Sequence, residues 1–108
     1  MANTFKLKTK ANVGITTQNV YVVPSATTTV VIGITLANVS GAGCMVGVGK
    51  TRPSADDVKV LKNVPIPQGS SIEYMSGNKV VLETADKLTV DSDVNNSVDV
   101  TLTIMETT

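Results

Sequence analysis

The chain has 108 residues, a length that fits one domain, and its nine Lys and Arg residues balance nine Asp and Glu residues. Zero net charge argues against a nucleic-acid partner, which would call for a basic surface. The chain has no histidine, so the commonest general base and metal ligand is missing, and Ser-His and Cys-His nucleophile pairs are excluded. These counts predict a protein that is not an enzyme and that needs no cofactor or metal.

Val, Thr and Ile make up 39 of the 108 residues, and such β-branched side chains favour strands. The three aromatic residues are one Phe and two Tyr. A small core with few aromatic anchors gains much from packing against neighbouring chains, which favours a homo-oligomer. The longest apolar runs are far shorter than a membrane span, so we expect no membrane partner.

The first segment, residues 4–16, alternates between apolar residues such as Phe5 and the lysines Lys6, Lys8 and Lys10. One interpretation is an edge strand whose lysines face water and block pairing with other chains. The other is an arm that lies on an acidic neighbour, and it makes these four residues candidates for an interface. In either case residues 1–16 are predicted to pack on a domain formed by residues 17–108.

Residues 27–39 are predicted to form a central strand, because large apolar residues alternate with smaller ones. The large ones are Val30, Ile32, Ile34 and Leu36. The opposite positions include Val31, Gly33 and Ala37, which are too apolar for an ordinary solvent face. We therefore expect Val31 to be covered by the N-terminal segment or by a neighbouring subunit. Residues 97–106 show the same alternation and are predicted to form the second central strand.

Six further short strands are predicted between turn signals, at residues 20–23, 45–49, 58–61, 71–75, 79–83 and 87–91. Pro65 and Pro67 bracket Ile66 and predict an extended segment outside the ladder. The total of eight to ten short strands predicts an all-β fold, an antiparallel β-sandwich of the jelly-roll or immunoglobulin-like kind.

Two motifs come close to known ligand sites. Residues 49–51, Gly-Lys-Thr, match the end of a phosphate-binding loop, but the glycine five positions earlier is replaced by Cys44 and no helix is predicted to follow. Residues 91–95 have the oxygen spacing of a calcium loop without its glycine and its final glutamate, and a hairpin turn is the better interpretation.

Other single residues have structural interpretations. Cys44 is predicted to be a small buried hydrophobe, and the pair Asp56 and Asp57 to be solvated in a polar loop. Tyr21 and Tyr74 could form a sugar platform but fit core or interface positions better.

Three stretches of the sequence resemble a family of small structural proteins of tailed-bacteriophage virions, of the marine and cyanobacterial type. They are VYVVP with TTTVVI and LAN (residues 20–24, 27–32 and 36–38), LKNVPIPQGSS (61–71), and VLETADKLTV with SVDV and Glu106 (81–90 and 97–100). Together they span about residues 20–106.

The resemblance implies a non-enzymatic virion protein assembled in the host cytoplasm. A capsid decoration or cement protein that stabilises the head shell is the leading hypothesis. Its expected partners are the major capsid protein or other virion proteins and further copies of itself, with a trimer as the guessed state. The alternative is a tail-fibre, neck or baseplate module for attachment or host-surface binding.

Overall fold

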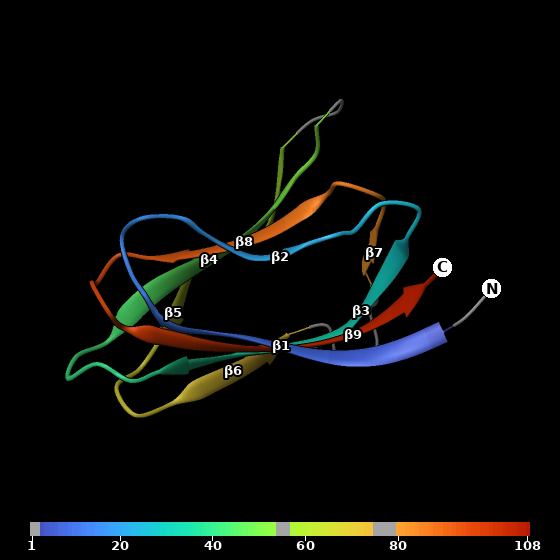
Figure 1. The fold of residues 1–108 in the computed structure, drawn as a ribbon. Coiled ribbons are helices and arrows are strands. Elements are labelled where there is room, and N and C mark those ends of the chain that lie inside the picture. The colour runs from blue at the N-terminus through green and yellow to red at the C-terminus, as the bar shows by residue number, and fades with distance from the viewer. Residues whose placement is uncertain (1–2, 54–56, 75–79) are drawn as a thin grey trace.

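The computed structural model describes residues 3–53, 57–74 and 80–108 (Figure 1). Within these ranges the chain is all-β, and its nine strands form two antiparallel sheets packed as a sandwich. In chain order the strands are β1 (Asn3–Val13), β2 (Gln18–Val22), β3 (Thr28–Asn38), β4 (Cys44–Thr51), β5 (Val58–Ile66), β6 (Ser71–Tyr74), β7 (Val80–Leu82), β8 (Lys87–Ser92) and β9 (Val98–Thr107). The predicted sandwich is confirmed, and so is the predicted number of strands.

The two sheets have a jelly-roll order. Sheet A runs β1-β9-β3-β6, with β7 also paired to β3, and sheet B runs β2-β8-β4-β5. Strands of the first half of the chain pair with strands of the second half: β1 with β9, β2 with β8, and β3 with β6. The chain is thus a long antiparallel hairpin wound around its own core, and both termini lie at the same end of sheet A (Figure 1).

The core lies between the sheets and is built from aliphatic side chains. The inward positions of β9, which are Val98, Val100, Leu102 and Ile104, are at most 1% exposed. This confirms the predicted inner face of the last strand. Because β9 pairs with β1 on one side and β3 on the other, it is the central element of sheet A.

The other central strand, β3, changes phase in its middle. Its pairing with β9 shifts between Val31 and Gly33, which marks a β-bulge at Ile32. Before the bulge the odd position Val31 is buried, and after it the even positions Ile34 and Leu36 are buried. The prediction that Val31 is covered by the N-terminal segment or a neighbouring subunit is therefore wrong, because Val31 faces the chain's own core.

The segment around the two prolines also differs from the prediction. β5 continues to Ile66, and Pro65 pairs with Met45 in the ladder. This is possible because β5 is the edge of sheet B, where a residue without an N–H can face away from its single neighbour.

Candidate functional site

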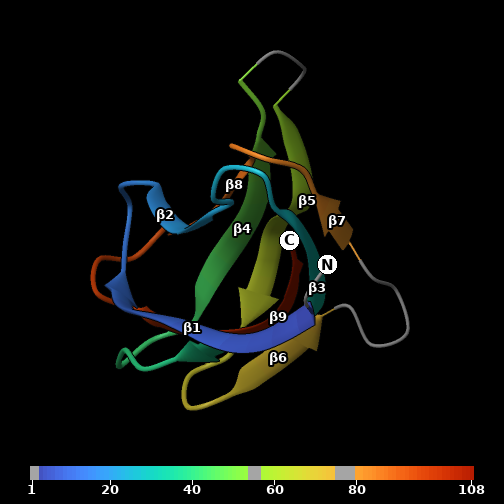
Figure 2. The ribbon, with the colours of Figure 1, turned by 45° about the vertical axis from the view of Figure 1, so that its right-hand side comes forward.

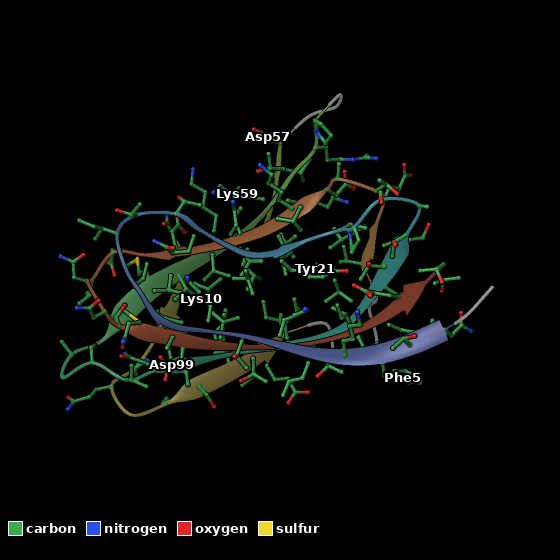
Figure 3. All side chains as sticks on the ribbon, in the orientation of Figure 1. Phe5, Lys10, Tyr21, Asp57, Lys59 and Asp99 are labelled. Atoms are coloured by element: carbon green, nitrogen blue, oxygen red, sulfur yellow. The ribbon has the colours of Figure 1, made fainter. Side chains whose placement is uncertain are left out.

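The first strand lies in sheet A with its charged side inward. Lys6, Lys8 and Lys10 pair directly with Ile104, Leu102 and Val100, and directly paired residues share a face of the sheet. Phe5 and Leu7 point the other way, with 69% and 64% of their surface exposed. Figure 3 shows Lys10 between the two layers and Phe5 beneath β1, away from sheet B. The predicted orientation, with the lysines outside, is therefore wrong.

Lys6 faces a buried carboxylate at this end of the sandwich. Glu106 occupies an inward position of β9, its side chain is 7% exposed, and one oxygen accepts a bond from Lys6 Nζ at 2.8 Å. Its other oxygen accepts a hydrogen bond from the Tyr21 hydroxyl. That hydroxyl also lies 2.8 Å from Thr29 Oγ1. We call these four residues the Glu106 cluster, and they connect β1, β3 and β9 of sheet A to β2 of sheet B.

The bonds within the Glu106 cluster stabilise the ionised form of Glu106 and the neutral form of Tyr21. The bond from Lys6, then the bond from Tyr21, lower the pKa of Glu106 below its ordinary value. Burial, then the bond to Glu106, raises the pKa of Tyr21 to about 12. Lys8 adds a cation 6.0 Å from the centre of the Tyr21 ring. The cluster thus consists of an ionised carboxylate, its cation and a neutral tyrosine, an arrangement suited to holding two sheets together.

Alkaline unfolding tests the state of Tyr21. Since the folded protein holds the Tyr21 proton more tightly than the unfolded chain, this contribution is complete below pH 10 and is lost as the pH rises to about 12. We expect the stability advantage of the wild type over Tyr21→Phe to shrink across that window. Urea unfolding of both proteins at a series of pH values measures it, and ionisation of the lysines affects both alike. A constant difference would contradict the burial of a neutral Tyr21 hydroxyl.

The inward lysines also affect the free edge of the sheet. β1 is an 11-residue strand at the end of sheet A, paired with β9 along one side (Figure 2). Inward-pointing charges on an edge strand discourage another chain from adding to that edge, because they would have to be accommodated in the extended sheet. The predicted protection of this edge by lysines thus remains reasonable, although they act from the inner face. Of the predicted interface residues, Lys6 already pairs with Glu106 within the chain, and Phe5 is exposed on the outer face.

The outer face of sheet A carries an apolar row that crosses four strands. Phe5 of β1 pairs with Met105 of β9, Met105 with Val30 of β3, and Val30 with Val81 of β7. Phe5 and Val81 are 69% and 53% exposed, and the two residues between them are partly exposed. Adjacent strands lie about 4.8 Å apart, so the row is a continuous apolar strip about 15 Å long.

The next rows of this face are also uncharged over β1, β9 and β3. Leu7, Thr103 and Gly33 form the second row, and the third consists of Thr9, Thr101 and Thr35. A Cβ added to Gly33 would meet no atom of the described residues within 4 Å, so the described surface is low at this point. The acidic residues of the face lie at its margins, Glu73 on β6 and Asp99 at the start of β9. We call the outward residues of these three rows, which include Val81, the outer face of sheet A.

The two ligand-like motifs have structural roles. Residues 49–51 lie in β4, where they line a hollow of about 230 Å³, and no helix N-terminus follows them in the described residues. In the other motif Asp91 accepts a bond from Thr17 and Asp93 accepts one from the Met45 amide. Asn96 then turns the chain with φ at 51°. This supports the hairpin interpretation, and no group of metal-ligating side chains occurs in the described part of the chain.

The remaining single-residue predictions have mixed outcomes. Cys44 is buried as predicted, and so is Tyr21, at 4% and 5% exposure. Asp57 accepts a bond from the Arg52 amide, whereas Asp56 lies outside the described residues. The described residues contain no helix long and apolar enough to cross a membrane. The residues that sequence reasoning missed are Leu7, Val81, Met105 and Glu106.

Comparisons with known proteins add a fold likeness. No family model matches the chain, and no curated protein matches it. Among solved structures, a chain from Bacillus endospore appendages, described as a novel family of disulfide-linked pili, is similar in fold, with a TM-score of 0.59 and 12% sequence identity. The match covers 99% of this chain and 87% of that one. At such low identity the likeness supports the sandwich architecture and extends no further.

Proposed function

We propose that the chain is a non-enzymatic structural subunit of a phage virion that decorates and cements the head shell as a homo-oligomer. The observation that carries this proposal is the outer face of sheet A. Its central rows consist of apolar residues, threonines and one glycine, and its two large β1 residues, Phe5 and Leu7, are mostly exposed in the single chain. Exposed contiguous apolar surface is typical of protein contact sites.

The Glu106 cluster supports the same role. It provides a fixed platform, because four strands are joined at one end of the sandwich by bonds between buried or half-buried groups. A rigid subunit that presents one preformed sheet face loses little conformational entropy on assembly. Many such contacts repeated over a shell then add through multivalency even when each is weak.

A neck, tail-fibre or baseplate module is the alternative within the virion. A filament is a further candidate, because the fold neighbour comes from pili. That neighbour's pili are disulfide-linked, whereas the single cysteine of this chain, Cys44, is 4% exposed. A filament of this chain would therefore be held together by non-covalent contacts, and the decoration role remains our preferred proposal.

Copy number in purified particles tests the decoration role. Quantitative mass spectrometry of particles of the phage that encodes the chain is expected to give a ratio to the major capsid protein that corresponds to hundreds of copies. A few to a few dozen copies would favour the neck or tail, and absence from the particle would overturn the proposal. Deletion of residues 1–10 is a poor test, because it would remove β1 from the edge of β9 and leave Glu106 without Lys6.

A further inference from the structure

We propose that the outer face of sheet A is covered by the same face of a second copy of the chain, related by a two-fold axis that runs along β9. The inference rests on the proposed function in taking this face as the assembly contact, and it adds the occupant and the geometry. Three properties of the face support the inference: the shape of its surface, its charge and its area.

The shape of the face is complementary to itself. Phe5 and Leu7 form a ridge along β1, with 69% and 64% of their surface exposed. Two strands away, Gly33 leaves a low place on β3 in the same row as Leu7. Since β9 lies between β1 and β3, rotation about an axis along β9 places the β1 ridge of one copy over β3 of the other.

This rotation preserves the position along the strands, so each row meets itself. Leu7 of one copy then lies over Gly33 of the other, and Phe5 lies over Val30 with Val81 beside it. Thr103 and Met105 of β9 lie on the axis and face their own counterparts. An axis across the strands would instead place Leu7 against Leu7, ridge on ridge, with the two glycines opposite each other.

Charge permits contact between identical surfaces. Among the described residues, the rows through Phe5 and Leu7 contain no charged residue, so the symmetric contact brings no like charges together there. Asp99 is four residues from Thr103 along β9, a distance of about 13 Å. On an axis along β9 the two Asp99 carboxylates face each other at this margin of the contact, where each accepts a bond from the Asn12 amide of its own chain and stays partly exposed to water.

The size of the face is sufficient for a stable pair. Under this rotation β1, β9 and β3 overlap their counterparts, and three strand positions about 4.8 Å apart with the ten residues of β9 give a face of about 500 Å² per copy, or about 1,000 Å² in total. A specific interface needs about 1,000 Å². The edge of β1 is a poorer contact, because its inward lysines discourage strand addition.

The oligomeric state of the purified chain tests the proposal. Sedimentation equilibrium is expected to give twice the 11.2 kDa chain mass. Leu7→Glu, which changes two positions of the dimer at once, is expected to weaken association about tenfold or more. The matched control is Ile15→Glu, which makes a similar change at a residue that is 61% exposed in the loop after β1 and should leave association unchanged.

Cross-linking tests the position of the axis. Thr103→Cys places a thiol next to its counterpart, and a short bismaleimide is expected to join the two copies. Lys62→Cys, on the exposed side of β5 in sheet B, should not be joined, and Cys44 is buried in both variants.

The two-fold contact would be overturned by any of three results: a monomeric wild type, a dimer that Leu7→Glu does not weaken, or a trimer in which Thr103→Cys gives no cross-link. Loss of association in both Leu7→Glu and Ile15→Glu would do the same, since it would show no dependence on this face. These outcomes are separate from the proposed function, which fails if the chain is absent from the virion.

Discussion

Replacing Leu102 with alanine is expected to lower the free energy of unfolding by about 3 kcal/mol, the typical cost of a leucine-sized cavity in a packed core. Leu102 is 0% exposed at the middle of β9, the strand that joins β1 to β3. Its neighbours in the ladder are Lys8 on one side and Ile34 on the other, and a lysine stem has little freedom to fill the space left behind.

The neighbouring position provides the control for this substitution. Thr103→Ala removes a side chain of the same strand that points outward, and we expect it to change stability by less than about 0.5 kcal/mol. Urea unfolding of both variants, followed by circular dichroism, measures the difference. A loss below about 1 kcal/mol for Leu102→Ala would contradict the central position of β9 in the core.

Replacing Glu106 with alanine is expected to destabilise the fold by about 2 kcal/mol. The substitution removes the partner of Lys6 and one of the two partners of the Tyr21 hydroxyl. The cost is smaller than for a fully buried ion pair, because 43% of the Lys6 side chain is exposed and its ammonium can turn to water. Glu106→Gln keeps the shape and should cost less.

Acid unfolding separates the charge of Glu106 from its packing. The bonds from Lys6 and then Tyr21 lower the pKa of Glu106 from 4.5. As the pH falls, the Glu106 carboxylate therefore takes up a proton at a higher pH in the unfolded chain than in the folded protein. The stabilisation is therefore complete above about pH 4.5 and is lost as the pH falls through the lower, folded value. We expect urea midpoints of the wild type to fall in this window more steeply than those of Glu106→Gln, and equal slopes would contradict an ionised, buried Glu106.

The positions of most strands could be predicted from the sequence, because alternation and turn residues are local signals. The inner face of β9 is correct for this reason, since Val98 to Ile104 alternate without interruption. The phase of β3 could not be predicted. A bulge at Ile32 inserts one residue against β9, and the alternation of apolar residues runs through it without a visible break.

The orientation of β1 depends on a contact between residues 100 positions apart. Both faces of this strand looked plausible as an inner face, and the apolar one was the natural choice. The available signal was Glu106, which continues the inward series of β9 beyond Ile104. A carboxylate at an inward position needs a cation, and the lysines of β1 were candidates to supply it. The edge-strand interpretation did not use this requirement, so it turned the lysines of β1 to water and missed the outer face of sheet A.

The contact between copies can be observed directly by isotope-filtered NOE spectroscopy on a mixture of labelled and unlabelled chains. The two-fold contact predicts intermolecular NOEs between the Leu7 methyl groups of one copy and the Gly33 α-protons of the other, with further ones from Phe5 to Val30. Intermolecular NOEs that arise instead from residues of sheet B, such as Val22 or Val58, would contradict it, as would their absence at concentrations where the chain is associated.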